Sequence, residues 1–201
     1  MSADARLFAP ATARNREFIL AVLRRHLPAA GTVLEIGSGS GEHAVFFAAE
    51  LPGLRWQPSE TEAGALASIR GWIAHAGVAN VADPLLFDAT AAQWPLAAAD
   101  AVVAINVIHY SPWATTPALL DGVARLLPPG GVLYFYGPYR RNGAHTAPSN
   151  EAFDGWLKER DPRFGVRDLE AVVAEAAARG LTLAEVAEMP ANNLSVVFRR
   201  A

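Results

Sequence analysis

Three glycines at alternate positions are the residues whose type and spacing point most directly to chemistry. Gly37, Gly39 and Gly41 follow a short apolar run, Val33–Ile36, and precede a helical pattern. A strand, a glycine turn and a helix build a cradle, because glycine lets the backbone approach a ligand and the first N–H groups of the helix are free to bind it. We therefore predict a nucleotide-type binding site at this turn, with Ser38 inside it.

The spacing of these glycines argues against a dinucleotide. The dinucleotide fingerprint G-x-G-x-x-G would place glycine at position 42, where this chain has Glu42. An anionic side chain just behind the turn would repel a pyrophosphate. Glu35, on the strand before the turn, is predicted to point its carboxylate at the pocket, which suits a ligand with a sulfonium or an ammonium group. A glycine turn with a purely structural role is the alternative.

Acidic residues follow the next two predicted strands. Ligands of open parallel sheets bind outside the carboxyl ends of the strands. Glu60 lies 19 residues beyond Gly41, close to the roughly 20-residue spacing at which an acid holds ribose hydroxyls; a solvated or capping carboxylate is the alternative. Asp88 and Ala89 follow the third strand, where Asp88 could accept a hydrogen bond from an adenine amino group or cap the next helix.

His109 is the candidate catalytic residue. It comes three residues after Asn106, which ends an apolar run and is expected to contact the cofactor. A histidine at this edge could take a proton from an acceptor hydroxyl, amine or acid, or could be structural. His43, in the helix after the glycine turn, is included in the expected cofactor site. No histidine pair at metal-ligand spacing stands beside a carboxylate cluster, so no metal site is predicted.

Composition narrows the choice of compartment and partner. The 201 residues carry a formal net charge of −3, so nucleic acid is not the favoured partner. The absence of cysteine removes thiolate nucleophiles and cysteine-ligated zinc. No signal-peptide core and no apolar stretch of membrane-spanning length stands in the sequence, so a cytoplasmic protein without a membrane partner is expected.

The order of the predicted elements favours a doubly wound α/β fold. Strands and helices alternate, which predicts a parallel sheet with helices on both faces. The last two strands lack a helix between them and should form an antiparallel hairpin. The predicted strands are 33–36, 54–58, 84–87, 100–106, 132–136, 181–187 and 195–198, and the helices are 14–27, 41–51, 62–75, 116–127 and one from about 168.

Residues 137–167 form an extra segment between the fifth strand and the next helix. A short helix is predicted at about Glu151–Arg160, capped by Ser149 or Asn150. Connections in such folds are usually short, so a long insert at the ligand-binding edge is a candidate substrate lid. The alternative is an insert that packs against the rest of the fold and has no role in binding a substrate.

Together these motifs resemble one family, called methyltransferase-like protein 26 in animals and domain of unknown function 938 in bacteria. The run E-x-G-x-G-x-G resembles motif I of class I S-adenosylmethionine (SAM) methyltransferases. Glu60 departs from the pattern, since aspartate is expected there in relatives. The matching stretches span nearly the whole chain: 14–17, 34–44, 56–59, 106–109, 111–113, 136–138, 149–154, 165–169 and 189–194.

The resemblance implies an α/β, Rossmann-like, seven-stranded class I methyltransferase fold in one domain over residues 1–201, with SAM as cofactor. It brings no substrate. The distinctive polar residues lie in the first helix, the insert and the final hairpin. Five aromatic side chains could wall the same site: Tyr110, Trp113, Tyr136, Tyr139 and Phe153. We expect them to hold a small polar acceptor: Asn15, Tyr110, Trp113, Tyr139, Arg140, Asn150 and Asn192. A SAM-binding protein without catalysis, a protein or RNA substrate, and an NAD-type oxidoreductase are the alternatives.

Overall fold

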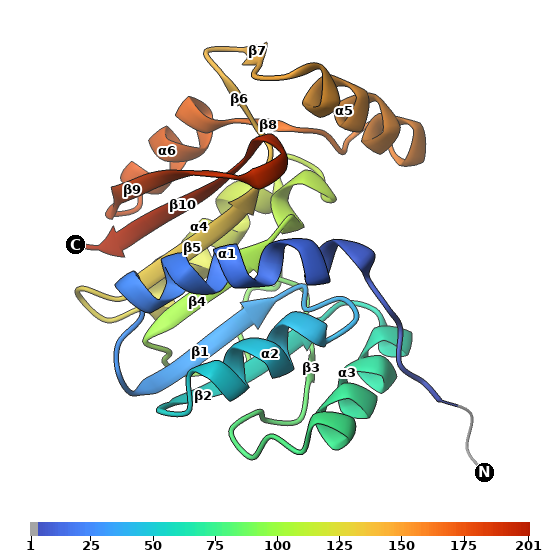
Figure 1. Cartoon of the computed structure of the whole chain (residues 1–201). Coiled ribbons are helices and arrows are strands. Elements are labelled where there is room, and N and C mark those ends of the chain that lie inside the picture. The colour runs from blue at the N-terminus through green and yellow to red at the C-terminus, as the bar shows by residue number, and fades with distance from the viewer. Residues whose placement is uncertain (1–3) are drawn as a thin grey trace.

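The computed structural model describes residues 4–201, and a seven-stranded sheet forms its centre (Figure 1). The strand order is β3-β2-β1-β4-β5-β10-β9. The first five run parallel, whereas β10 is antiparallel to both of its neighbours. The strands are β1 Gly31–Ile36, β2 Leu54–Glu60, β3 Leu85–Leu86, β4 Ala101–Ile105, β5 Val132–Gly137, β9 Leu181–Met189 and β10 Asn193–Arg200. The predicted doubly wound sheet with a terminal hairpin is confirmed.

Helices cover both faces of this sheet. On one face α1 (Pro10–His26) and α2 (Glu42–Glu50) pack over the sheet, with α3 (Ala63–Ala76) beside α2. On the other face lie α4 (Thr115–Leu126) and α6 (Leu169–Ala177). Alternate side chains of a strand point to opposite faces, which is why the apolar run of β4 contributes to both cores.

The insert forms a second, small sheet that the sequence did not predict. Its strands are β6 (Tyr139–Arg141), β7 (Ala144–His145) and β8 (Arg167–Asp168), in the order β7-β6-β8. With helix α5 (Pro148–Arg160), β6 and β7 project beyond the main sheet at the top of Figure 1. Two- and three-residue strands are too short to show a periodic pattern, so sequence analysis could not find them.

The predicted start and cap of the insert helix are wrong. Helix α5 begins at Pro148 after Ala147, and no side chain caps it. Proline suits the first helical position because it lacks the N–H that a cap would satisfy. Ser149 and Asn150 therefore lie inside the first turn, where their side chains are available for tertiary contacts. Within residues 4–201, no helix has the length and hydropathy that crossing a bilayer requires.

Candidate functional site

The glycine turn lies between β1 and α2, and its three glycines serve different purposes. All three have positive φ angles, 66° for Gly37, 57° for Gly39 and 94° for Gly41, a region that favours glycine. A Cβ atom on Gly37 would lie 2.7 Å from a methyl group of Val107, and one on Gly41 would lie 2.8 Å from Cα of Ile69. A Cβ on Gly39 would meet nothing within 4 Å. Gly39 therefore borders open space that a ligand can approach.

The carboxylate of Glu60 stands at this open side of the turn. The parallel register pairs Ile36 with Ser59, which brings the end of β2 beside the turn. Glu60 Oε2 accepts a hydrogen bond from Gly39 N–H at 2.9 Å, and Oε1 accepts one from Thr61 N–H at 2.7 Å. The two features that sequence analysis linked by spacing alone are thus in direct contact.

Glu35 lies beneath the turn and is almost fully buried. Its Oε2 accepts a hydrogen bond from the indole N–H of Trp56 at 2.8 Å. Burial raises the pKa of Glu35 to about 7 and outweighs the hydrogen bonds from Trp56 and Ser38, which lower it. Ser38 itself bridges to β2, donating its backbone N–H to the carbonyl of Ser59 at 2.9 Å. A buried carboxyl that titrates near neutral pH gains charge readily when a cation binds close to it.

Asp88 and Ala89 follow β3, at the same edge of the sheet. Oδ1 of Asp88 accepts from the backbone N–H and the hydroxyl of Thr90, each at 2.8 Å. The exposed carboxylate thus closes a local turn and caps no helix, because the chain beyond it stays irregular up to β4. Ala89 is buried in the core.

His109 ends a short 3-10 turn, Val107–His109, after β4. Its side chain is fully buried, and burial, ahead of the nearby Arg167 charge, lowers its pKa to about 3. Nδ1 accepts the backbone N–H of Arg167 at 3.3 Å, so the proton of the neutral ring is assigned to Nε2. Nε2 faces the backbone of Gly137, where a Cβ atom would lie 2.5 Å from it. The His109 ring thus links the loop after β4 to the insert. The role of His109 as a base stays a prediction.

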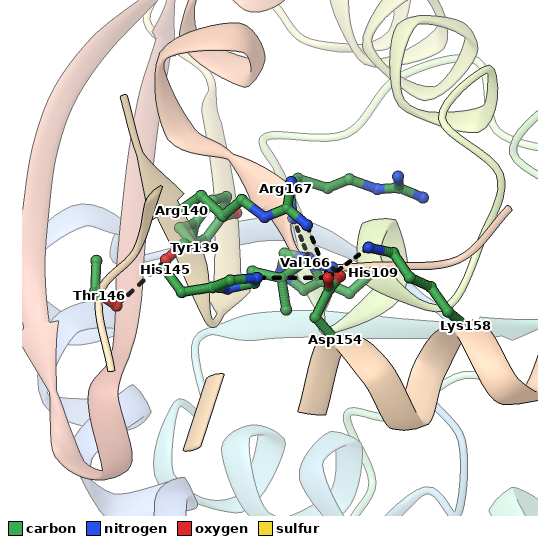
Figure 2. A network of polar contacts seen from close by, with 9 residues as sticks. All are labelled: His109, Tyr139, Arg140, His145, Thr146, Asp154, Lys158, Val166 and Arg167. Carbon is green, nitrogen blue, oxygen red and sulfur yellow. Dashed lines mark hydrogen bonds and ion pairs between the residues drawn. The ribbon is translucent and has the colours of Figure 1, made fainter. Parts of the chain in front are cut away.

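Asp154 holds the insert together (Figure 2). Its buried carboxylate accepts from Arg140 at 2.7 Å, from Lys158 at 2.6 Å and from the backbone N–H of Val166 at 2.7 Å. His145 lies 3.5 Å from the same carboxylate. One side chain of α5 therefore ties that helix to β6, β7 and the chain entering β8.

The insert is also bound to the loop after β4. The Arg167 guanidinium donates to the carbonyl of Ile108 at 2.8 Å and to that of Ser111, and its central carbon lies 5.9 Å from the ring centroid of Trp113. The carbonyl of His109 accepts from Gly165 N–H at 3.0 Å. Residues 108–113 are thereby fixed by the segment that was predicted to be a lid.

A second polar cluster lies on the α1 face of the same edge. His43 Nε2–H donates to Oδ1 of Asn15 at 2.8 Å, which joins α2 to α1. Burial, with the charge of Arg16, lowers the pKa of His43 to about 4, so this ring is neutral at physiological pH. Burial raises the pKa of the Tyr136 hydroxyl, and its hydrogen bond with Asn15 opposes that shift. Arg16 is not among the predicted site residues, although it belongs to a stretch that matches the family.

The remaining predicted acceptor residues divide into buried and exposed ones. Tyr139 is fully buried, with its ring edge-on to His109. Asn150, also buried, donates to the hydroxyl of Thr146 and to the carbonyl of Asn192, while the exposed Asn192 amide donates to Ser149. Arg140, half-buried, is engaged by Asp154. Tyr110 is 41% exposed and makes edge contacts with Phe153 and Trp156 of α5.

Two surface hollows lie away from these residues. One, of about 330 Å³, is lined by Trp94 and Gly122, and the other, of about 380 Å³, by Arg24 and Pro52. Neither touches the glycine turn, and the polar side chains that could do chemistry stand elsewhere. Among residues 4–201, no group of three or more histidine or acidic side chains is arranged to hold a metal ion.

The sheet order, the terminal hairpin, the glycine turn after β1 and the acid after β2 define the Rossmann-like fold of class I methyltransferases. Solved structures share it. The SAM-dependent methyltransferase SibL matches with a TM-score of 0.78 and 21% identity over 94% of this chain and 55% of its own. An O-methyltransferase family protein from Burkholderia thailandensis matches with a TM-score of 0.82 and 17% identity over 95% of this chain and 57% of its own. CalO1, a methyltransferase in calicheamicin biosynthesis solved with SAH, matches with a TM-score of 0.76 and 21% identity over 95% of this chain and 54% of its own.

The chain thus spans about half the length of these proteins. Residues 6–200 match the family described as protein of unknown function, DUF938, and the chain belongs to that family.

Proposed function

We propose that the protein is a SAM-dependent methyltransferase that acts on a small polar acceptor. The observation that carries this proposal is the contact between Glu60 and Gly39 at the open side of the glycine turn. A carboxylate there can accept hydrogen bonds from two ribose hydroxyls, and the backbone of the turn leaves room for the ligand. The structural neighbours support the proposal, since SibL and CalO1 are methyltransferases and CalO1 was solved with SAH.

The residues present fit such a donor. Gly37–Gly41 would line the backbone side of the cofactor, Glu60 would hold the ribose, and Asp88 and Asn106 lie at the ends of β3 and β4 on the same edge. Glu35, whose pKa burial raises to about 7, would complement the charge of a cationic ligand. When bound, SAM supplies an electrophilic methyl group on its sulfonium.

The insert supports a small acceptor. Helix α5 is fixed through Asp154, and its Phe153 and Trp156 pack against Tyr110 in the loop after β4. These aromatic side chains would form one wall of the acceptor site and exclude water from it. Asn15 and the exposed Asn192 stand on α1 and the final hairpin, at the same edge, and would supply polar contacts.

Calorimetric titration with SAM, SAH and NAD tests the donor. We expect SAM and SAH to bind and NAD not to bind. Glu60→Ala should weaken SAH by about 1–3 kcal/mol, as for a lost hydrogen bond to a charged group. Glu62→Ala is the matched control, because Glu62 is an exposed acid two residues away whose side chain makes no capping bond. Preferential binding of NAD, or equal SAH affinity in both variants, would contradict the proposal.

A SAM-binding protein without catalysis is the second candidate. The burial of His109 and its assigned protonation on Nε2 favour it, because a general base needs a free, accessible nitrogen. Incubation of the protein with SAM and a small-molecule metabolite extract, followed by measurement of SAH release, separates the two. SAH release that depends on the extract supports the enzyme, and its absence with intact SAM binding supports the binding protein.

A further inference from the structure

The N-terminal strap, residues 4–9, crosses helix α3. The Arg6 guanidinium lies 5.0 Å from the ring centroid of Trp72, and the ring of Phe8 meets Trp72 edge-on at 5.2 Å. The indole N–H of Trp72 donates to the carbonyl of Leu7 at 2.9 Å. In Figure 1 this part of the chain runs from the start of α1 past α3. The strap therefore packs against α3, the helix that follows β2, through specific contacts with Trp72.

Ser68 connects the strap to the glycine turn. Its hydroxyl is fully buried, accepts the backbone N–H of Leu7 at 2.7 Å and donates to the carbonyl of Ser40 at 2.7 Å. Ser40 stands between Gly39 and Gly41. A single hydroxyl group thus bridges the strap and the middle of the turn.

Glu42 makes a second bridge between the same two segments. Its Oε2 accepts the backbone N–H of Ala9 at 2.6 Å and the hydroxyl of Ser40 at 2.9 Å. Ser40 is therefore held at its carbonyl by Ser68 and at its hydroxyl by Glu42, and both side chains also hold the strap. Glu42 therefore has a structural role in this chain, at the position where a dinucleotide fingerprint would have glycine.

The composition of α3 fits the strap as well. Gly71 lies inside α3, where glycine is disfavoured relative to alanine. A Cβ atom at Gly71 would lie 2.9 Å from Cγ of Arg6. By contrast, a Cβ atom at Gly64 of the same helix would meet nothing within 4 Å. The space taken by the strap is thus provided by the glycine at position 71.

We propose that Ser68 and Glu42 are positioning residues that couple the strap to the glycine turn, so that residues 4–9 form part of the donor site. The inference rests on the proposed binding of SAM at that turn. Coupling between two sites is reciprocal. A ligand that fixes the turn must therefore also fix the strap, and a change that loosens the strap must weaken binding at the turn.

Hydrogen–deuterium exchange on the full chain tests the first direction. The reporters are the backbone amides of Leu7 and Ala9, which donate to Ser68 and Glu42. We expect saturating SAH to slow their exchange by about tenfold or more, equivalent to about 1.4 kcal/mol of added local stability. Unchanged exchange of both amides in the SAH complex would overturn the proposal.

Variants of the bridging residues test the second direction. Ser68→Ala should weaken SAH by about tenfold, as for the loss of two neutral hydrogen bonds. Glu42→Ala should weaken SAH similarly. Glu42→Gln should restore most of the affinity, because the amide oxygen can still accept from Ala9 N–H and the Ser40 hydroxyl. This rescue separates positioning of the turn from a general effect of the acidic charge.

Two glycine variants in one helix provide the matched pair. Gly71→Ala should displace Arg6, weaken SAH and abolish its effect on the strap amides, whereas Gly64→Ala should bind SAH within about twofold of wild type. Equal SAH affinity of Ser68→Ala, Gly71→Ala and wild type would overturn this inference and leave the proposed function standing. Failure of the wild-type chain to bind SAH would overturn both.

Discussion

At the scale of single residues, Glu35 should make the stability of the protein fall as pH rises. Burial raises its folded-state pKa from 4.5 to about 7, so between these values the folded chain binds more protons than the unfolded chain. The free energy of unfolding then decreases with rising pH, by at most about 3.4 kcal/mol. Urea unfolding of wild type and Glu35→Gln at about pH 4.5, 6 and 8 measures this decrease. The free energy of unfolding of Glu35→Gln relative to that of wild type should increase along this series.

Two buried histidines change the pH dependence of stability in the opposite direction, so their effect must be separated from that of Glu35. The folded-state pKa of His43 is lowered to about 4 and that of His109 to about 3, from 6.5. The stability that they contribute is present above the unfolded pKa and is lost as pH falls below it. Because wild type and Glu35→Gln share both histidines, the difference between the two proteins isolates the carboxyl group. A difference that stays constant from pH 4.5 to 8 would contradict the assignment.

Gly39 provides a second residue-scale prediction. Gly39→Val should abolish SAH binding in a folded protein, because the branched side chain fills the open space at the turn. The left-handed backbone also costs about 1–2 kcal/mol of stability for a residue with a Cβ atom. Gly77→Val is the control: Gly77 has a similar φ angle of 64° and open space around it, but lies at the end of α3.

Thermal unfolding and calorimetry with SAH distinguish the two glycine variants. Both should lose similar stability, and only Gly39→Val should lose SAH. If folded Gly39→Val bound SAH normally, the turn could not be the cradle for the cofactor.

At the scale of elements, the insert should depend on one carboxylate. Burial alone would raise the pKa of Asp154, but the bonds from Lys158, Val166 and Arg140 lower it, so the charged form is favoured. Asp154→Asn should cost about 2 kcal/mol, below the value for a fully buried ion pair because Arg140 and Lys158 keep contact with water. Proteolysis within residues 144–167 should become faster. Chemical unfolding and timed digestion measure the two effects.

Asp161→Asn is the control for this element. Asp161 follows the same helix and pairs with Arg163 on the surface. Its replacement should leave both the unfolding midpoint and the cleavage pattern near those of wild type. Equal effects of the two substitutions would show that Asp154 does not hold the insert.

The elements also show how much of the fold the sequence predicts. The long strands were located because their apolar runs contribute to two cores, as in β4, and the glycine turn was located because its φ angles require glycine. The small sheet β6–β8 and the start of α5 were missed. Their strands have two or three residues, and Pro148 starts the helix without a capping side chain.

The site was predicted less completely than the fold, for a related physical reason. Spacing along the chain identified Glu60 and Gly39, since the register between β1 and β2 brings them together. Burial of single side chains in an insert has no periodic signal. The buried positions of Tyr139 and Asn150, and the tie made by Asp154, arise from tertiary contacts that only the folded chain reveals.

At the scale of the whole molecule, the charge distribution bears on the proposal that the acceptor is a small molecule. Seventeen basic and 20 acidic residues give a formal net charge of −3. Several basic side chains near the insert are already paired, Arg140 and Lys158 with Asp154 and Arg163 with Asp161. Nucleic-acid binding draws most of its affinity from unpaired cations that replace counterions on phosphates. The charge pattern therefore supports a small acceptor over RNA.

Fluorescence anisotropy with a labelled single-stranded RNA tests this prediction in the presence of SAH. We expect dissociation constants no tighter than the roughly 10⁻⁴–10⁻⁶ M of non-specific binding, and a shallow dependence on salt between about 50 and 200 mM. The half-exposed aromatic residues Tyr110 and Trp156 are the main counter-argument, because bases stack on such rings. A tight complex that weakens steeply with salt, and is lost in Trp156→Ala, would move the acceptor from a small molecule to RNA. Binding that is weak and the same in wild type and Trp156→Ala would support the small acceptor.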